Sequence, residues 1–226
     1  MGEIRIVTDF SEKQKTRPLY EQAFADPAAF VDYYYREKCR DNIMVVRYGE
    51  AGEVLSMLHL NPYTVRVLGQ DVPAYYVVAV ATDRAHRRKG LMAEVLRRAF
   101  AFLEEEKVPF VFLLPVDEAI YTPFGFSTVC DFITREHPLY AMPYEEVQRR
   151  YDVYCLRDEL YLRRQAEEDA LAAEGCAEVL PDRPVMMIRV THAGGFSALL
   201  GLPGDAEAQI LPEAMKGLRV YFREEV

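Results

Sequence analysis

The sequence lacks the features that place a chain in or across a membrane. No stretch of its 226 residues approaches the about 20 consecutive apolar residues that a membrane-spanning helix needs. The first residues, Met-Gly-Glu-Ile-Arg-Ile, contain no apolar signal core, and Ile6 stands where N-myristoylation needs Ser or Thr. We therefore expect neither secretion nor a lipid anchor, no membrane partner, and a cytoplasmic location.

Cysteine is scarce, and basic residues are in deficit. Cys39, Cys130, Cys155 and Cys176 lie far apart without a paired metal-binding spacing, so we expect free thiols in a reducing cytoplasm and no metal. The 27 Lys and Arg face 36 Asp and Glu, which gives a net charge of -9. This balance argues against nucleic acid as a partner and tolerates a cationic substrate such as an amine.

What is present is the composition of an ordered globular protein, with 50% hydrophobic and 28% charged residues. Strands are predicted at 4–7, 43–48, 53–60, 63–68, 73–81, 110–114, 126–135 and 185–190, with Asn61-Pro62 as the turn between two of them. Helices are predicted at 17–24, 30–38, 88–107, 117–121, 144–150, 158–173 and around 196–200. The pattern of residues along the chain changes after His137-Pro138, which favours a domain boundary there.

The most informative stretch is a basic turn between an apolar run at 75–81 and the long amphipathic helix at 88–107. Its basic or histidine residues are Arg84, His86, Arg87, Arg88 and Lys89. Cations at a helix start oppose the helix dipole, so such a cluster is most readily tolerated where an anion binds. Free backbone N–H groups and Gly90 would complete a phosphate cradle. The alternative is an ordinary solvated basic surface.

Two motifs in this layout resemble the GCN5-related N-acetyltransferases (GNATs). The segment Val-Ala-Thr-Asp-Arg-Ala-His-Arg-Arg-Lys-Gly-Leu-Met at 80–92 is similar to the acyl-CoA signature Arg/Gln-x-x-Gly-x-Gly/Ala. The segment Ala-Ile-Tyr-Thr-Pro-Phe-Gly-Phe at 119–126 is similar to the family's Leu/Ile-Tyr-x-x-x-Gly-Phe motif. Arg87 and Gly90 match the signature, whereas Met92 replaces its usual small residue. The resemblance implies an α+β GNAT fold: a central mixed, mostly antiparallel sheet with splayed parallel strands, flanked by helices.

Further segments resemble the enhanced-intracellular-survival type of acetyltransferase. They include His-Arg-Arg-x-Gly-Leu from residue 86, Leu-Pro-x-Asp-Glu-Ala-Ile-Tyr-x-Pro-Phe-Gly-Phe from residue 114, and the strand at 185–190. Members of that group are usually much longer, with a second GNAT-like region and a sterol-carrier-like domain. We therefore interpret 1–138 as the catalytic domain and 139–226 as a small α/β C-terminal extension, a reduced remnant of those regions.

The resemblance implies acetyl-CoA as the co-substrate and no metal. The pantetheine arm would be held by the strand backbone near Val78, Ala79 and Val80. The pyrophosphate would be bound by backbone N–H groups of the turn, with charge-assisted contacts from Arg87 and Arg88. The predicted cofactor-binding residues are thus Val78, Ala79, Val80, Arg87, Arg88, Lys89, Gly90, Leu91 and Met92.

Tyr121 is the predicted general acid. Its phenol ordinarily titrates near pH ~10, close enough to a thiol to deliver a proton to the departing thiolate. The alternative is that Tyr121 merely packs beside Phe124. A backbone N–H near Val80 or Ala81 would polarise the thioester carbonyl, as the family implies.

The general base stays open at this stage. Single histidines such as His59 and His86 are more often structural or surface residues than bases. Carboxylates at a helix start are usually caps, and an α-carboxylate is a weak base unless it is desolvated. The candidates are Asp117, Glu118, the C-terminal carboxylate of Val226, and water.

We therefore predict direct transfer of an acetyl group from acetyl-CoA to a primary amine of a small, cationic acceptor. Aminoglycoside-like polyamines are one class that the resemblance suggests. Acidic residues of the two N-terminal helices would attract such a cation or form a solvated face: Glu21, Asp26, Asp32 and Glu37. Two alternatives are a non-catalytic acyl-CoA-binding protein that lost its acceptor site and an enzyme for longer acyl-CoAs. Because relatives commonly assemble, a homo-oligomer is also considered.

Overall fold

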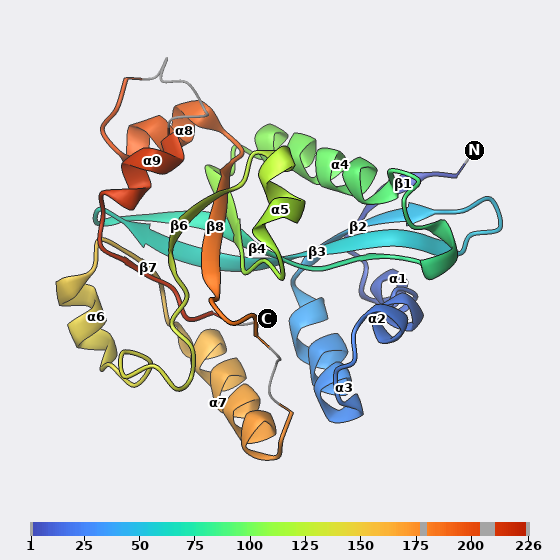
Figure 1. The fold of residues 1–226 in the computed structure, drawn as a ribbon, viewed down its shortest axis with the longest axis horizontal. Helices are drawn as coiled ribbons and strands as arrows, with labels where there is room; N and C mark the ends of the chain where they lie inside the picture. Colours follow the sequence, from blue (N-terminus) through green and yellow to red (C-terminus); the bar gives the residue numbers. More distant parts are fainter. Residues whose placement is uncertain (1, 177–179, 204–210, 225–226) are drawn as a thin grey trace. The chain divides into compact units, whose positions relative to one another are not determined.

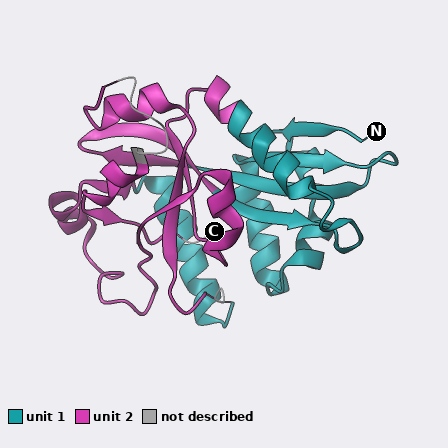
Figure 2. Ribbon diagram, turned by 45° about the horizontal axis from the view of Figure 1, so that its top comes forward, with its two compact units in different colours: residues 1–62, 77–101, 157–179 teal, residues 63–76, 102–156, 180–226 magenta. Residues whose placement is uncertain are grey.

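The computed structural model describes residues 2–176, 180–203 and 211–224. The chain forms an α+β fold whose residues group into two compact units, shown in two colours in Figure 2. The first unit contains residues 1–62, 77–101 and 157–179, and the second contains residues 63–76, 102–156 and 180–226. Strands β3 (Val54–Val67) and β4 (Gln70–Thr82) and helix α4 (Leu91–Glu105) contribute residues to both units. Among the described residues, no helix is long and apolar enough to cross a membrane.

The first unit has an antiparallel sheet in the order β1-β2-β3-β4 (Figure 1). Strand β1 (Ile4–Val7) pairs with β2 (Ile43–Tyr48), and β2 pairs with the first half of β3 from Val54 to Leu60. The centre of β2, Met44–Val46, is fully buried, which accounts for the apolar residues there. The predicted strands at 4–7 and 43–48 are confirmed.

One predicted turn is wrong, because β3 continues through Asn61-Pro62. Proline donates no hydrogen bond and is tolerated only where a strand edge is unpaired. On this edge the pairing with β2 ends at Leu60 and the pairing with β7 (Val153–Cys155) begins at Val65. Pro62 lies in the interval between the two partners, so the strand continues without losing a ladder hydrogen bond.

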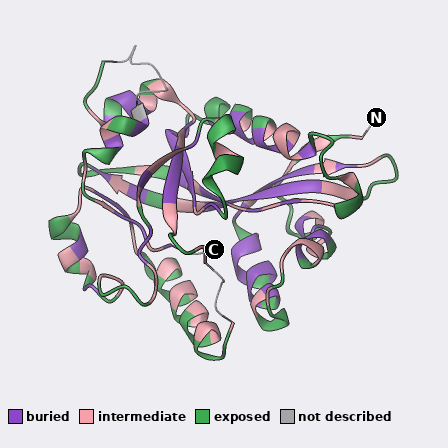
Figure 3. Ribbon diagram, viewed as in Figure 1, coloured by how far each residue is buried: buried purple, intermediate pink, exposed green. Residues whose placement is uncertain are grey.

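The helices of the first unit include one that the sequence did not predict, α1 (Phe10–Gln14), which begins where the Asp9 side chain accepts a hydrogen bond from the Glu12 amide at 3.0 Å. Helices α2 (Arg17–Ala23) and α3 (Ala28–Glu37) follow as predicted. An aromatic core joins them to β3: the ring of Tyr34 stacks on His59 at 5.7 Å and on Tyr20 at 5.3 Å. Burial on these helices is shown in Figure 3.

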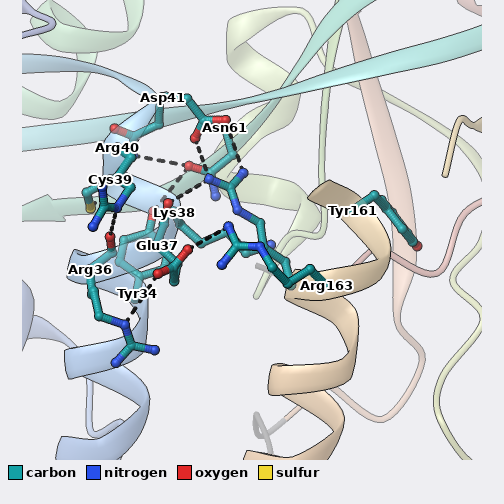
Figure 4. Close-up of polar contacts among 12 residues, drawn as sticks. Tyr34, Arg36, Glu37, Lys38, Cys39, Arg40, Asp41, Asn61, Tyr161 and Arg163 are labelled. Atoms are coloured by element: carbon teal, nitrogen blue, oxygen red, sulfur yellow. Dashed lines mark hydrogen bonds and ion pairs between the residues drawn. The ribbon is translucent and has the colours of Figure 1, made fainter. Parts of the chain in front are cut away.

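Helix α7 (Glu159–Ala173) packs against α3 through charged side chains (Figure 4). Lys38 pairs with Glu168 at 2.7 Å, and both side chains are almost fully buried. Arg163 pairs with Glu37 at 2.9 Å, and Arg36 pairs with Glu167. A helix with no apolar stripe is therefore held in the first unit by ion pairs, although it lies beyond the predicted boundary at residue 138.

The second unit has a mixed sheet in the order β9-β7-β3-β4-β5-β8-β6, in which β9 is the short strand Val220–Tyr221. Its parallel pair between β4 and β5 (Phe110–Leu113) is short, with a register of Tyr75 on Val111 and Tyr76 on Phe112. Strand β8 (Val185–Val190) is antiparallel to both β5 and β6 (Ser127–Asp131). The inner strand β8 thus comes from residues 139–226, the stretch predicted to form the C-terminal extension.

Several elements of the second unit differ from the predictions. The long strand expected at 126–135 ends at Asp131, because the next amides turn to other acceptors: Phe132 donates to Pro184 O and Ile133 to Phe222 O. Helix α6 (Tyr144–Arg150) and helix α8 (Ala193–Leu199) are close to their predicted positions. The sequence did not indicate two short elements, β7 and helix α9 (Leu211–Lys216). Strand β9 (Val220–Tyr221) lies in the stretch 218–222, where the sequence predicts that the loosely defined tail ends.

Candidate active site

The basic turn that precedes α4 is anchored by Asp83. The Asp83 carboxylate accepts hydrogen bonds from the Ala85 amide at 3.0 Å and from Gln22 Nε2 at 3.0 Å, and it pairs with His86 Nδ1 at 2.7 Å. Hydrogen bonds, first from His86 and then from Gln22, lower the pKa of Asp83. Gln22 in turn accepts from the Arg84 amide at 3.1 Å, so α2 holds the start of the turn in place.

The backbone after this anchor has an unusual conformation. Arg88 and Gly90 have positive φ angles of 61° and 82°. Such a conformation is natural for glycine and strained for arginine. A Cβ placed on Gly90 would meet no atom within 4 Å, so the glycine serves the backbone angle and leaves open space outside the turn.

A run of consecutive amides in this turn is left without hydrogen bonds. The Glu94 amide is the first to donate within the helix, to Gly90 O at 3.1 Å. Across the described ranges, the amide N–H groups from Arg87 to Ala93 donate to no protein acceptor. Free N–H groups at a helix start, on a backbone exposed to solvent, form an anion-binding site.

The side chains of the turn add positive charge. Arg84 and Arg87 donate to the carbonyl oxygens of Gln22 and Thr82, at 2.9 and 3.3 Å. Within the described part of the chain, Arg88 and Lys89 form no ion pair and are exposed. Glu94, the acidic residue of the first helical turn, is paired with Arg47 at 3.0 Å, which offsets its negative charge. The predicted residues Arg87, Arg88, Lys89 and Gly90 thus lie in this turn, and Leu91 and Met92 are the first two residues of α4.

The strand that leads into this turn is distorted at one of the predicted backbone positions. Ala79 is buried and has a φ of 51°, a strained angle for a non-glycine residue in a strand. From Ala74 onwards, burial along β4 alternates except at Tyr76 and Val77, which are both buried. The distortion resembles a β-bulge, which redirects the backbone groups of a strand. Val78 and Val80 flank it and are half-buried.

Tyr121 lies in the second unit, at the end of the short helix α5 (Glu118–Tyr121). Its ring contacts Phe126 edge-on at 5.8 Å. Burial raises the pKa of Tyr121 to about 12. Among the described residues, its hydroxyl has no hydrogen-bond partner, which leaves the proton available to a ligand.

The two carboxylates beside Tyr121 have structural roles. Asp117 caps α5 by accepting from the Ala119 amide at 2.9 Å. Glu118 accepts a hydrogen bond from the Thr128 hydroxyl. The third candidate base, the carboxylate of Val226, lies outside the described residues. His59 is fully buried, and burial lowers its pKa to about 3, which leaves it neutral and inaccessible.

The acidic side chains expected to attract a cationic acceptor all have partners inside the first unit. Arg17 pairs with both Glu21 and Asp32, at 2.8 and 2.6 Å. Asp26 accepts from the Tyr20 hydroxyl at 2.6 Å, and Glu37 is paired with Arg163. These contacts favour the solvated-face alternative over a cation-binding surface. Across the described ranges, no cluster of His, Cys, Asp and Glu is arranged to hold a metal ion.

Comparison with known families decides the classification. A family model described as an acetyltransferase (GNAT) domain matches residues 3–129, more than half of the chain. The chain belongs to the GNAT acetyltransferase family. The predicted α+β GNAT fold is confirmed, with its mixed, mostly antiparallel sheet and its C-terminal extension. None of the curated proteins compared with this GNAT chain matches it.

Solved structures similar to this GNAT protein share its fold at low identity. A GCN5-related N-acetyltransferase from Anabaena variabilis has a TM-score of 0.59 at 14% identity, over 86% of this chain and 74% of that one. Eis1 from Mycobacterium abscessus has a TM-score of 0.51 at 16% identity, over 75% of this chain and 48% of that one. The predicted resemblance to the enhanced-intracellular-survival type is therefore matched at the level of the fold.

The chain is shorter than some of these relatives. A probable N-acyltransferase from Enterococcus faecalis has a TM-score of 0.53 at 16% identity, over 58% of this chain. The match spans about a third of that protein, 33% of its length.

The sequence missed Asp83 and Gln22 as the anchors of the turn. An aspartate directly before a helical turn is a capping signal and would have indicated Asp83. Gln22 lies about 60 residues earlier in the chain, and no local pattern connects it with the turn.

Proposed function

We propose that this protein is an N-acetyltransferase that moves the acetyl group of acetyl-CoA to a primary amine. The proposal is carried by one observation, the run of unbonded amides from Arg87 to Ala93 at the start of α4. The pyrophosphate of acetyl-CoA is an anion, and free N–H groups at a helix start can donate hydrogen bonds to it. The dipole of the helix also favours negative charge at this end. Arg88 and Lys89 supply charge-assisted contacts to the pyrophosphate.

The same substrate would be held further along by the backbone of β4. We assign the pantetheine arm to the N–H and C=O groups near Val78, Ala79 and Val80. The support is the positive φ of Ala79, which turns backbone groups away from regular strand pairing. A non-glycine residue in that conformation costs about 1–2 kcal/mol, which suggests that the distortion serves binding.

The reaction is acyl transfer. The neutral amine nitrogen attacks the thioester carbonyl carbon, the C–S bond breaks, and the sulfur takes the proton of the Tyr121 hydroxyl. The nitrogen loses one proton to water, and the Tyr121 phenolate is reprotonated from solvent. The raised pKa of Tyr121, about 12, keeps the phenol protonated at neutral pH and therefore suits an acid rather than a base.

Water is the base that we propose. Asp117 and Glu118 are engaged as a helix cap and as the acceptor of the Thr128 hydroxyl. An acceptor amine of modest pKa would lose its proton to solvent without a dedicated side chain. We propose a small amine as the acceptor; the paired state of Glu21, Asp26, Asp32 and Glu37 gives no support for a polycation.

The test combines binding and turnover. Acetyl-CoA at about 100 times its dissociation constant should stabilise the protein by roughly 2.7 kcal/mol, measured as a rise in melting temperature. Thiol release from acetyl-CoA should then depend on an added amine from a panel of small mono- and polyamines. A set of longer acyl-CoAs in both assays tests the alternative donor.

The outcomes separate the candidate functions. Stabilisation together with amine-dependent thiol release supports the enzyme. Stabilisation without thiol release for any amine supports the acyl-CoA-binding protein instead. No stabilisation by any acyl-CoA would refute both, because both depend on the amides before α4.

A further inference from the structure

The turn that follows Tyr121 accepts a hydrogen bond from an arginine that lies outside both GNAT-like motifs, 80–92 and 119–126. Arg189 belongs to β8, where it is paired in register with Val111 of β5. Its guanidinium Nη1 donates a hydrogen bond to the carbonyl oxygen of Phe124. This contact joins the second motif to a strand 65 residues further along the chain.

Gly125 provides a second, independent sign of that contact. It has a φ of 81° and ends the short helical turn Thr122–Phe124 in the left-handed conformation. A Cβ at this position would overlap Nη1 of Arg189. The glycine of the motif is therefore needed both for its backbone angle and for the space that the guanidinium occupies.

The position of Tyr121 depends on this turn rather than on its own hydroxyl. Within the described residues the hydroxyl has no hydrogen-bond partner, so the ring is oriented by the backbone and by its contact with Phe126. The turn closes when the Gly125 amide donates to Thr122 O at 3.0 Å and the Phe126 amide to Tyr121 O at 3.5 Å. Arg189 binds the carbonyl of Phe124, which belongs to the same peptide group as the Gly125 amide.

We propose that Arg189 is a positioning residue for the acid of the transfer reaction, acting through the Phe124 carbonyl on the Tyr121–Phe126 turn. The inference rests on the proposed function, in which Tyr121 protonates the departing thiolate. Burial of the guanidinium, which lowers the pKa of Arg189, is tolerated because the carbonyl accepts its hydrogen bond. No step of the reaction uses the arginine itself.

The first test is a double-mutant cycle on turnover. Arg189→Met keeps much of the aliphatic stem and removes the donor, and it should lower kcat by roughly ten- to a hundredfold, because small misplacements of a reacting group have effects of this size. The KM for acetyl-CoA should stay within about twofold of the wild-type value, because Arg189 is not proposed to contact the bound acetyl-CoA. In a Tyr121→Phe background the same substitution should have no further effect on kcat.

Arg223→Met is the matched control. The guanidinium of Arg223 also donates to a backbone carbonyl, that of Tyr140, at 2.5 Å. Arg223→Met should lower stability, and its effect on kcat should be the same with and without Tyr121→Phe. An equal loss of kcat from Arg189→Met with and without Tyr121 would overturn the proposal, because a merely structural residue produces that result.

The second test does not require activity. Hydrogen–deuterium exchange at the Gly125 and Phe126 amides should become faster in Arg189→Met and stay unchanged in Arg223→Met. Arg189→Lys, which keeps a cation and a donor, serves if Arg189→Met does not fold, and it should show intermediate exchange. If the wild type transfers no acetyl group, the proposed function fails, and the exchange alone decides whether Arg189 holds the turn. Unchanged exchange refutes that role.

Discussion

At the scale of the residue, the phenol of Tyr121 is the group that the proposed reaction uses as its acid. It combines a pKa raised by burial to about 12 with a hydroxyl that, in the described part of the chain, has no protein partner. A group stays protonated below its pKa, so the acid form of Tyr121 persists at neutral and mildly alkaline pH.

Tyr121→Phe should therefore lower kcat by about 10²–10⁴-fold, the usual contribution of a general acid, with little effect on acetyl-CoA affinity. In the wild type, kcat should show no alkaline loss from this group up to pH about 10, because the pKa is shifted upward from the ordinary phenol value. A pH–rate profile measures this. An alkaline limb that disappears in Tyr121→Phe, with an apparent pKa near 10, would mean that the phenol is not buried in the working enzyme.

His59 gives a second prediction at this scale. Its pKa is lowered to about 3 by burial, whereas an unfolded histidine titrates near 6.5. Between these values the unfolded chain binds the extra proton, so stability is lost as the pH falls from about 6.5 towards 3, by on the order of a few kcal/mol. His59→Gln should have a shallower acid loss in urea unfolding from pH 7 to pH 4, whereas His137→Gln, at an exposed ring, should follow the wild type. Equal slopes for all three proteins would contradict the assignment.

The residues that could be predicted from sequence were those with a local pattern. Arg87, Gly90 and Tyr121 lie in short motifs whose spacing is visible without a structure. Gln22 and Arg189 act across the chain, on Asp83 and on Phe124, and nothing near them in sequence indicates their partners. Long-range hydrogen bonds of this kind are set by packing and not by periodicity.

At the scale of the element, the start of α4 combines a positive φ at Gly90 with amides that have no protein acceptor. Gly90→Ala should lose about 1 kcal/mol of stability, because a Cβ disfavours the left-handed conformation. It should also weaken acetyl-CoA binding, measured as a smaller ligand-induced rise in melting temperature.

Gly52→Ala is the matched control for this change. Gly52 has a φ of 86°, and a Cβ there also meets nothing within 4 Å. The two variants should lose similar stability without ligand, and only Gly90→Ala should lose ligand stabilisation. A similar ligand effect in both would argue against the turn before α4 as the phosphate site.

The contact of α3 with α7 gives a prediction about ion pairs. Lys38→Met leaves Glu168 nearly buried without its cation and should destabilise the protein by roughly 3–5 kcal/mol. Arg36→Met removes a partner of Glu167 in an exposed pair and should have an effect below about 1 kcal/mol. Urea unfolding of both variants measures the difference. If both variants lose a similar free energy of unfolding, the buried Lys38–Glu168 pair contributes no more to stability than the exposed Arg36–Glu167 pair.

Elements with strong periodicity were predicted well, and those whose limits depend on partners were not. The amphipathic pattern predicted α4 to within a few residues at each end. The turn at Asn61-Pro62 and the long strand after Phe126 were wrong, because β3 continues between two partners and β6 ends where its amides find other acceptors. Neither partner is visible in the local sequence.

At the scale of the whole molecule, strand β8 connects the two predicted regions of the chain. It is antiparallel to β5, whose four residues are all buried, and to β6. A fragment of residues 1–138 would lack it and expose the apolar edge of β5, so the predicted boundary at 138 has a direct test. We expect the fragment to fail to fold, as measured by circular dichroism and protease resistance.

The control for that experiment is the same fragment with residues 180–226 supplied as a separate chain. Recovery of resistance on mixing would show that the missing strand is the cause. A fragment that folds alone, with a cooperative urea transition, would establish residues 1–138 as an independent domain.

The late position of β8 also has a consequence for synthesis. Translation delivers β5 to the ribosome exit long before the strand that covers it, so the nascent polypeptide carries an uncovered apolar edge during that interval. Chaperone capture should peak in this interval and end after residues 185–190 emerge, which stalled translation intermediates of increasing length would reveal.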